Sequence, residues 1–406
     1  MVLCRIPRNR ADCLEHKAGF LRCRSERSTV AESAAAAGLA AFHIRGQGRE
    51  VRGLEMRSKL AFRLKSPCFQ IQQSLSISRL SFMDTTFKTP ATPLSLLAVV
   101  VLYKTRPTDS ISLRTLMQSA SQVRGDSLNL RVLLYDNSPN AASDDNDVPN
   151  GVRIFRATRN AGLANAYNYA LELAQAEGCN WLLTLDQDTS LPMHALARLT
   201  ALAQQFQDRE DVAAIVPELI EREIVQSPLY VQRRHRRRMQ IGYCGFPESE
   251  ITVMNSCTMW NVRHLMEIGG FDRDFWLDYL DYVMCHRTFR SGRKIYVAGD
   301  IRVEHQLSLA NWKDRMSPER LQNILAAESA FNDLYKSPVD RLLLTMKLLA
   351  LFCTRTLKRE DSRFLRIIRR EMFRRLFESR KIRLAEWQTS AQLKNQDGWK
   401  EAGNAQ

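Results

Sequence analysis

The hydrophobic pattern of the chain changes near residue 93, where an irregular Arg-, Ser- and Ala-rich stretch gives way to regularly spaced apolar runs. Runs of strand length, suited to burial, occupy 96–103, 130–135, 152–155, 180–185 and 212–216. Apolar positions at helical spacing separate them, at 112–123, 161–176 and 193–206. Strands that alternate with helices through short connections predict an α/β domain with a mostly parallel, Rossmann-like sheet.

Beyond residue 217 the pattern is looser, with a predicted strand at 251–260, a helix at 275–290 and a strand at 294–298. After residue 311 the spacing predicts helices only, with apolar and basic positions interleaved from 342 to 376. We therefore predict four segments. They are a disordered or overextended N-terminal segment at 1–82, a catalytic domain at 93–310, a basic amphipathic helical region at 311–385 and a flexible tail at 386–406.

The net charge of +15 comes from basic flanks around a slightly acidic central body. This distribution argues against a nucleic-acid partner and favours contact between a flank and an anionic membrane surface. No apolar stretch reaches the roughly 18–20 residues that span a bilayer. The nine cysteines include no Cys-x-x-Cys pair, so reduced thiols are expected. We predict a cytoplasmic protein, with peripheral attachment to the inner face of the plasma membrane as an option.

Two carboxylates, Asp186 and Asp188, directly follow the apolar run at 182–185. Ligands of open α/β sheets bind at the carboxyl ends of the strands, where this pair is expected. The two carboxylates repel each other unless a cation lies between them, and hard oxygen ligands suit Mg²⁺ or Mn²⁺. The alternatives are a polar strand end or a helix N-cap, because a helical pattern follows. The pair by itself favours neither interpretation.

Polar residues also follow two other predicted strands. Asp136 and Asn137 follow the run at 130–135 and suit a nucleobase and ribose, although such residues also readily form an Asx turn at a strand end. Asn160 and Gly162 open the next helix, whose free N–H groups suit an anionic ligand unless Asn160 simply caps it. Asn168, one turn further, has no evident structural role.

A second pair of acids, Asp278 and Asp281, is spaced i and i+3 at the start of the predicted helix 275–290. A carboxylate on that face is suited to act as a general base, although helix-start electrostatics also favour Asp there. His305 follows the last predicted strand and is either a metal or diphosphate contact or an ordinary structural histidine.

The order of these motifs resembles the family 2 inverting glycosyltransferases, which have the GT-A fold, and within them the bacterial rhamnosyltransferases that use dTDP-rhamnose. The similarity extends over about residues 95–310. It rests on 99–103, 136–138, the Asn160-x-Gly162-Leu163-Ala164-x-Ala166-x-Asn168 stretch, 186–188, 269–272, 278–287, Gly292 and Glu304-His305.

The resemblance implies a role for each candidate residue. Asp188, supported by Asp186 and assisted by His305, would hold Mg²⁺ or Mn²⁺ against the donor diphosphate, and Asp281 would deprotonate the acceptor. The implied donor contacts are Tyr103, Asp136, Asn137, Asn160, Gly162, Asn168 and Asp186. Val283 stands where such enzymes often carry a further acid, which leaves open whether Asp278 or Asp281 is the base.

These features predict transfer of a sugar, with rhamnose from dTDP-rhamnose favoured, to a lipid-linked or polysaccharide acceptor in the synthesis of an O-antigen-like surface glycan. A haloacid-dehalogenase-type phosphohydrolase is the first alternative, since Asp-x-Asp-x-Thr follows a strand. That class needs the motif on its first strand and a downstream lysine. Here three predicted strands come before the motif, and Lys294 is the only lysine between residues 105 and 312. A catalytically silent nucleotide-sugar-binding protein is the second. The sequence contains no P-loop motif, which excludes a P-loop NTPase.

Overall fold

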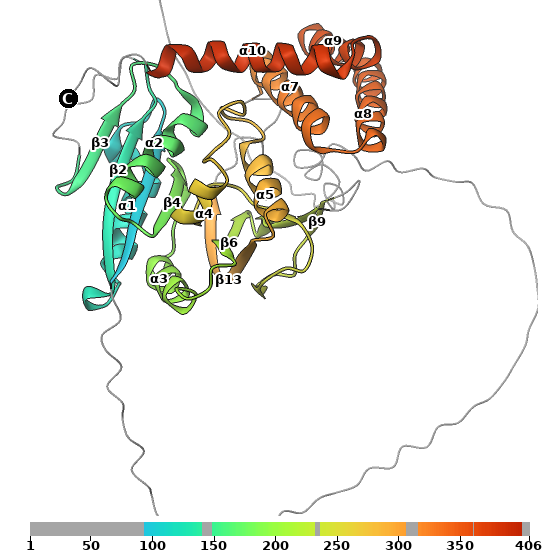
Figure 1. The fold of residues 1–406 in the computed structure, drawn as a ribbon. Helices are drawn as coiled ribbons and strands as arrows, with labels where there is room; N and C mark the ends of the chain where they lie inside the picture. Colours follow the sequence, from blue (N-terminus) through green and yellow to red (C-terminus); the bar gives the residue numbers. More distant parts are fainter. Residues whose placement is uncertain (1–92, 140–147, 232–235, 306–315, 360, 400–406) are drawn as a thin grey trace, which may run out of the picture.

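The computed structural model describes residues 93–139, 148–231, 236–305, 316–359 and 361–399. It is an α/β structure built on a curled, mostly parallel sheet with helices on both faces, which confirms the predicted fold class (Figure 1). The predicted N-terminal segment at 1–82 lies outside the described residues.

The main sheet has ten strands in the order β10-β13-β6-β12-β4-β1-β2-β3, with β5 paired to β13 and β7 to β6. A second sheet joins β11, β8 and β9. The strands are β1 Leu94–Leu102, β2 Leu128–Asp136, β3 Val152–Arg156, β4 Trp181–Asp186, β5 Thr189–Ser190, β6 Val212–Glu221, β7 Ile224–Ser227, β8 Leu229–Val231, β9 Arg236–Arg238, β10 Cys244–Gly245, β11 Ile251–Thr252, β12 Thr258–Asn261 and β13 Lys294–His305.

Strand β1 lies between β2 and β4 and is parallel to both, so all three end at the same edge of the sheet. Its side chains alternate between two apolar clusters. Leu97, Val99 and Val101 face one cluster, and Leu96, Ala98, Val100 and Leu102 face the other. A parallel strand covered on both faces needs apolar residues at every position, which explains the unbroken apolar run in the sequence.

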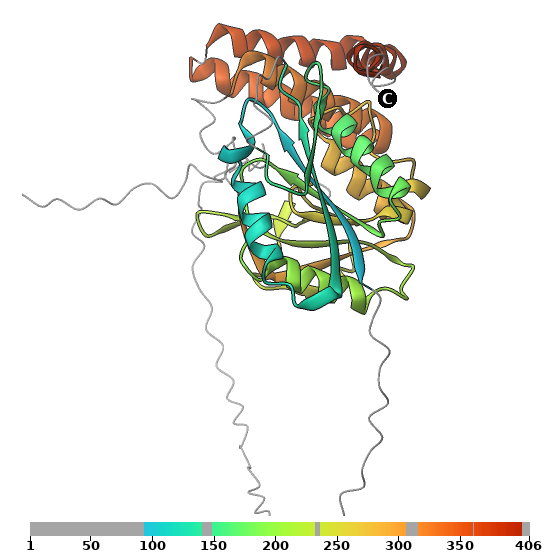
Figure 2. The same cartoon turned by 90° about the vertical axis from the view of Figure 1, so that its left-hand side faces the viewer.

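The helices are α1 Ile111–Ala120, α2 Gly162–Ala176, α3 Ala195–Gln205, α4 Val262–Glu267, α5 Leu280–Arg290, α7 Pro318–Tyr335, α8 Pro338–Leu357, α9 Ser362–Phe377 and α10 Arg380–Trp399. Helices α1 and α3 contribute to one apolar cluster, and α2, α4 and α5 to the other, so the two groups cover opposite faces (Figure 2). No described helix has both the length and the apolar character needed to cross a bilayer.

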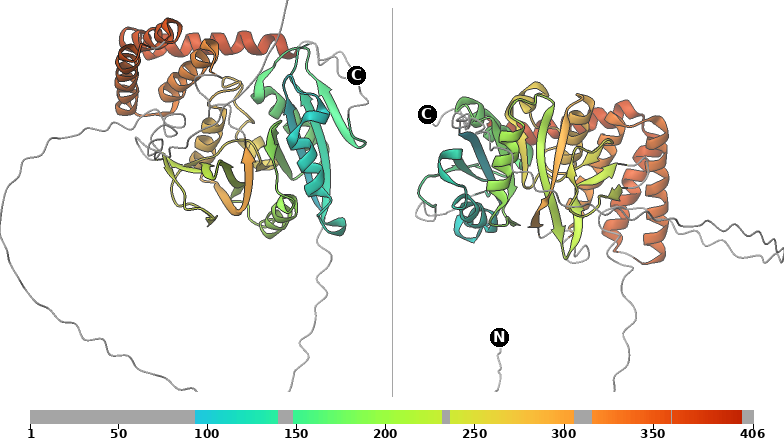
Figure 3. Two further views of the ribbon diagram at one scale, coloured as in Figure 1. Left: turned by 180° about the vertical axis from the view of Figure 1, so that it is seen from behind. Right: turned by 90° about the horizontal axis from the view of Figure 1, so that it is seen from below.

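Helices α7, α8 and α9 share a small core of their own, which includes Leu321, Leu344, Leu348, Ile368 and Met372. Figures 1 and 3 show α8 and α9 on the side of the domain away from β3, with α10 running back across it to α2. We expected residues 386–406 to be a flexible tail, but residues through Trp399 continue α10. The reason is tertiary packing, since Ala391 is buried and the Trp387 ring lies 5.2 Å from that of Phe275.

Two predicted elements differ from the structure. The predicted strand 251–260 is divided into β11 and β12, which belong to different sheets. The predicted helix 275–290 begins only at Leu280, because Tyr279 has a left-handed backbone with φ of 64°. Asp278 therefore precedes the helix, and the expectation that it shares a helix face with Asp281 is wrong.

Asn168 has a structural role that the sequence did not reveal. Its side-chain amide donates to the Phe271 carbonyl at 2.8 Å and accepts from the Phe271 N–H at 2.9 Å. These two bonds tie α2 to the segment that follows α4. Gly270 makes the approach possible, since a Cβ on it would lie 2.5 Å from the Asn168 Oδ1 atom.

We expect Gly270→Ala to lower the free energy of unfolding by at least about 3 kcal/mol, because it adds a steric clash to the strain of a positive φ. Gly292→Ala is the matched control. Its φ of 76° is close to the 75° of Gly270, but nothing lies within 4 Å of the added Cβ, so it should cost only about 1–2 kcal/mol. Urea denaturation measures both, and equal costs would contradict the role given to Asn168.

Candidate metal and catalytic site

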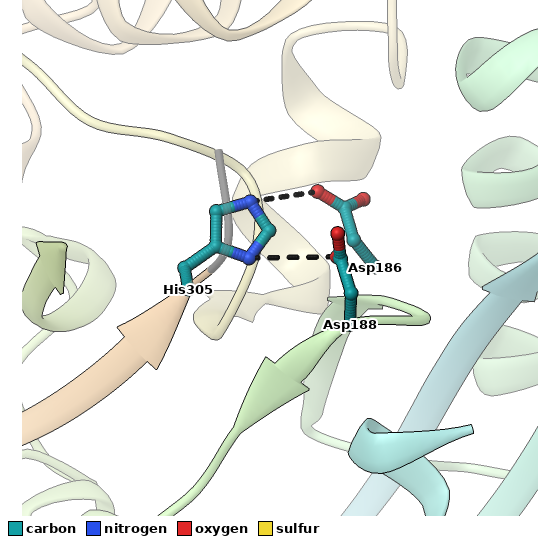
Figure 4. A group of neighbouring side chains, drawn as sticks. All are labelled: Asp186, Asp188 and His305. Carbon is teal, nitrogen blue, oxygen red and sulfur yellow. Dashed lines mark ion pairs between the residues drawn. The ribbon is translucent and has the colours of Figure 1, made fainter. Parts of the chain in front are cut away.

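Asp186, Asp188 and His305 form a compact cluster at the carboxyl edge of the sheet (Figure 4). Asp186 ends β4, and His305 ends β13, where it pairs with Thr189 of β5. His305 Nδ1 lies 3.5 Å from Asp188 Oδ1, and its Nε2 lies 3.8 Å from Asp186 Oδ2. The ligand atoms of all three residues lie within 4.8 Å of one another, so one ion can reach them together.

The helix-capping alternative for Asp188 is wrong. Residues Thr189 and Ser190 form β5, and the next helix, α3, begins at Ala195 with His194 at its N-cap. Asp188 is thus held in a tight turn between two strands rather than at a helix start.

Four neutral side chains support the cluster, and sequence analysis missed them all. The Tyr167 hydroxyl donates to Asp186 Oδ1 at 3.3 Å, and Thr189 Oγ1 bonds His305 Nδ1 at 3.1 Å. Ser112 accepts from the Thr189 N–H at 2.8 Å and donates to the Asp186 carbonyl, while Ser256 accepts from the Asp186 N–H. Such outer contacts orient metal ligands. For Tyr167, the sequence did offer a signal, because a hydroxyl within the apolar pattern of α2 needs a hydrogen-bond partner in the core.

The donor set fits a divalent cation. Burial raises the pKa of the Asp186 carboxyl, while the neighbouring His305 opposes that shift and Asp188 adds to it. Two carboxylates and one imidazole are the donor types that Mn²⁺ accepts, and the carboxylates also suit Mg²⁺. A bound ion would relieve the repulsion between Asp186 and Asp188.

Asp281 lies in the first turn of α5, and burial raises the pKa of its carboxyl to about 6. Arg236 opposes this rise, and its guanidinium lies over the Tyr282 ring, 4.3 Å from the centroid. The buried Tyr167 hydroxyl connects the two halves of the site, because the charges of both Asp186 and Asp281 raise its pKa after burial itself. The metal cluster and Asp281 therefore lie within electrostatic reach of one side chain.

Asp278 differs from Asp281 in already having a cationic partner. Its Oδ1 lies 3.0 Å from Arg320 Nη2 of α7, and its side chain is only 9% exposed. Burial raises the pKa of the Asp278 carboxyl, and Arg320 and then Lys394 oppose the rise.

The start of α2 is occupied by protein contacts rather than open to an anion. The Asn137 side chain accepts from the Ala161 N–H at 2.7 Å and donates to the Gly162 carbonyl at 3.2 Å. Asn160 accepts from the Gly162 N–H, and the Ala164 N–H donates to the Trp276 carbonyl. A Cβ on Gly162 would lie 2.4 Å from the Trp276 ring, so this glycine permits packing on Trp276. Asn137, Asn160, Gly162 and Asn168 thus each have a structural partner within the protein, and their contact with a donor stays a prediction.

Asp136 ends β2 and Tyr103 follows β1, so both lie at the carboxyl edge of the sheet. Asp136 is buried, and its Oδ1 accepts from the Ser138 N–H at 2.9 Å, which is the Asx turn considered as an alternative. Tyr103 is 40% exposed, and its N–H donates to Gln187 Oε1 at 2.7 Å, so it adjoins the metal loop.

With this geometry in place, comparison with known proteins is informative. Residues 113–269 match the sequence model described as Glycosyl transferase family 2. This segment is a family 2 glycosyltransferase domain. The match contains Asp186 and Asp188 but ends before Asp281 and His305.

The chain is also 22% identical, over 184 residues, to the dTDP-rhamnosyl transferase RfbF of Shigella flexneri. The aligned part is 44% of this chain and 60% of that relative.

Two solved structures resemble the chain more distantly. GalNAc-T7 with UDP, GalNAc and Mn²⁺ has a TM-score of 0.45 and 16% identity over 59% of this chain and 50% of that one. S. aureus TarS 1–349 in complex with UDP-GlcNAc has a TM-score of 0.42 and 14% identity, and the match covers 75% of this chain and 89% of that one. At this distance they carry no argument about the chemistry of this protein.

We expect Asp188→Asn to weaken Mn²⁺ binding at least about tenfold, because it removes one anionic ligand from a three-residue set. Asp126→Asn, on an exposed turn, is the control and should bind Mn²⁺ normally. Isothermal titration with MnCl₂ and circular dichroism would measure affinity and folding. Normal Mn²⁺ affinity in a folded Asp188→Asn variant would rule out the metal site.

Proposed function

We propose that the protein is an inverting glycosyltransferase that uses a nucleotide-sugar donor and a divalent cation. The observation that carries this proposal is the Asp186–Asp188–His305 cluster at the carboxyl edge of the sheet. The half-buried Asp281 is near enough to Tyr167, whose hydroxyl bonds Asp186, for its charge to raise the pKa of that hydroxyl. The metal cluster suits the anionic diphosphate of a donor, and Asp281 suits removal of a proton from the acceptor. The match to a family 2 glycosyltransferase domain supports the same reaction.

The reaction is a single displacement at the anomeric carbon. The acceptor hydroxyl forms a bond to that carbon as its proton passes to Asp281, and the bond to the phosphate oxygen breaks with its electron pair on the departing nucleoside diphosphate. A divalent cation at the cluster would supply charge stabilisation to that diphosphate. Because one displacement suffices, the configuration at the carbon inverts.

Asp281 is the better candidate for the base. Its pKa of about 6 leaves it ionised at neutral pH yet basic enough to take up a proton in the transition state. The Asp278 carboxylate already faces Arg320, so proton uptake there would leave the Arg320 guanidinium without its counter-charge.

The donor we favour is dTDP-rhamnose, with Mg²⁺ or Mn²⁺, and the acceptor we favour is a lipid-linked or polysaccharide glycan. The relative from Shigella flexneri is named a dTDP-rhamnosyl transferase, which supports that sugar. We assign the donor contacts to Tyr103, which follows β1, and to Asp136 and Asp186, which end β2 and β4.

The test is a donor screen. Purified protein with Mn²⁺ is given a panel of nucleotide sugars, and released nucleoside diphosphate is measured with and without glycan acceptors. We expect turnover with dTDP-rhamnose and thermal stabilisation by dTDP. Stabilisation by UDP alone would indicate a UDP-sugar donor in place of dTDP-rhamnose. If no nucleoside diphosphate binds, the proposed function is refuted.

We expect kcat/KM to rise with pH through about 6 and then to level off, because Asp281 must be ionised to accept a proton. Asp281→Asn should lower kcat at least about 100-fold and remove this limb of the profile. Arg236→Gln should shift the limb to higher pH, since Arg236 favours the ionised form of Asp281. A normal profile in Asp281→Asn would exclude it as the base.

We further propose that the protein attaches peripherally to an anionic membrane through α9. In the structure, some residues of the predicted amphipathic region are buried and others are exposed to solvent. Leu344 and Leu348 are buried, and Arg375 is buried against Asp333. The outer side of α9 instead exposes Phe373, Leu376 and Phe377, and Arg366, Arg369 and Arg370 line a groove of about 440 Å³ beside them. Exposed aromatic and cationic residues on one helix are typical of interfacial binding.

We expect the protein to float with vesicles of phosphatidylglycerol and phosphatidylcholine but not of phosphatidylcholine alone. Arg369→Glu/Arg370→Glu should reduce vesicle binding at least about tenfold. Arg114→Glu/Arg124→Glu is the matched control, since both arginines are exposed on and after α1. Equal flotation of the two double variants would rule out α9 as the attachment site.

A further inference from the structure

We propose that Arg236 and Arg238 of β9 bind the diphosphate of a lipid-linked acceptor and thereby place the acceptor hydroxyl at Asp281. This inference rests on the proposed function and names the class of acceptor for it. The two arginines belong to the small sheet of β11, β8 and β9, which is separate from the sheet that contains the metal cluster.

The small sheet is fixed to α5, the helix whose first turn contains Asp281. The Val253 N–H donates to Cys285 Sγ of α5 at 3.2 Å. Glu250 Oε1 lies 3.0 Å from His286 Nδ1, also of α5. Because these two contacts are made on either side of β11, the small sheet has a defined position against the base helix.

Strand β9 reaches the base through Arg236. The Arg236 guanidinium lies 4.3 Å from the centroid of the Tyr282 ring, and the charge distribution of an aromatic ring attracts a cation to its face. Tyr282 directly follows Asp281, and its N–H donates to Asp281 Oδ1 at 2.9 Å. One ring and one backbone hydrogen bond thus connect the guanidinium to the base.

Strand β9 consists of three exposed arginines, Arg236–Arg238. Side chains alternate along a strand, so Arg238 shares a face with Arg236, and Arg237 lies on the opposite face. Among the described strands β9 is the outer one of its sheet, and charges on an outer strand hinder pairing with another chain. That role accounts for charge on β9, but not for the placement of Arg236 over a ring of the base helix.

The charges beside the base favour an acceptor that carries phosphate. The Asp281 carboxylate repels an anion unless cations lie close by. Arg236 and Arg238 supply two guanidinium groups on one face, and their planar N–H donors match the oxygens of a diphosphate. A neutral polysaccharide has no group that needs such a pair.

The position of the arginines also indicates where the phosphate lies on the acceptor. Arg236 contacts the residue that follows the base, so the phosphate would lie close to the reacting hydroxyl. In a lipid-linked acceptor the diphosphate is bonded directly to the first sugar, which has this arrangement. The donor diphosphate is assigned to the metal cluster, which leaves β9 for the acceptor.

The test uses geranyl diphosphate as the probe for a lipid diphosphate and geraniol as the same chain without phosphate. Isothermal titration is carried out on the full chain with Mn²⁺ and a saturating concentration of dTDP or UDP, whichever binds, so that the metal cluster is filled. We expect geraniol to bind at least about tenfold more weakly than geranyl diphosphate. Added NaCl should weaken binding of geranyl diphosphate, because exposed charges are screened by salt.

Arg236→Gln and Arg238→Gln should each weaken binding of geranyl diphosphate at least about fivefold, and the double variant about 10- to 100-fold. Arg237→Gln is the matched control, since it removes the same charge from the same strand on the opposite face, and it should bind the probe normally. The affinity for the nucleoside diphosphate should be unchanged in all four variants, and circular dichroism checks their folding.

The outcomes are distinct. If the unaltered protein binds dTDP or UDP but the double variant keeps full affinity for geranyl diphosphate, the inference fails and the proposed function stands. If Arg237→Gln loses as much affinity as its neighbours, or if the double variant loses nucleoside diphosphate binding by the same factor, the inference also fails.

Two further results separate other anions from a lipid-linked acceptor. If the double variant binds geranyl diphosphate normally but no longer floats with phosphatidylglycerol vesicles, β9 contacts the membrane surface and the inference fails. If glucose 1-phosphate binds as tightly as geranyl diphosphate, a lipid-linked acceptor is excluded. If the unaltered protein binds no nucleoside diphosphate, both proposals fail.

Discussion

The antiparallel pairing of β5 with β13 is the contact on which the site depends. Strand β5 contains only Thr189 and Ser190, yet it brings the turn after β4 against the end of a strand more than a hundred residues later in the chain. Without it, Asp186 and Asp188 would lie at the end of β4 with no imidazole near them. The side chains of Ser112 and Thr189 hold the turn in this register, and both are fully buried. The packed sheet thus holds Asp186, Asp188 and His305 in fixed positions.

The C-terminal helices are joined to the catalytic domain by polar contacts as well as by packing. Asp333 of α7 accepts from Arg375 and Arg383 in a buried cluster that ties α7 to α9 and α10. Helix α10 then contacts α2 through Asn395 and Asn165. Buried ion pairs are costly when one partner is lost, so these helices are expected to assemble as a unit. This arrangement places Arg320 and Asp278 at a junction rather than on a detachable extension.

The candidate residues divide into two groups once their partners are known. Asp186, Asp188, Asp281 and His305 carry charge or basicity that protein contacts leave available. Asn137, Gly162 and Asn168 are equally prominent in the sequence, but their polar groups or small size are used to join α2 to the segments around Trp276 and Phe271. A motif can therefore contain both chemical and structural residues, and spacing alone does not distinguish them.

The amino-acid sequence by itself determined the α/β class, the order of most strands and the edge at which the acidic residues gather. These follow from local periodicity and from the rule that parallel strands end together. Only the tertiary structure decided that Asp188 lies in a turn between two strands and that Asp278 precedes α5. It also decided that residues expected to form a flexible tail belong to α10. Each of these depends on contacts between segments far apart in the chain, such as Thr189 with His305 or Phe275 with Trp387. Such contacts leave no periodic trace in the sequence, because the free energy that selects them comes from burial and pairing across the whole fold.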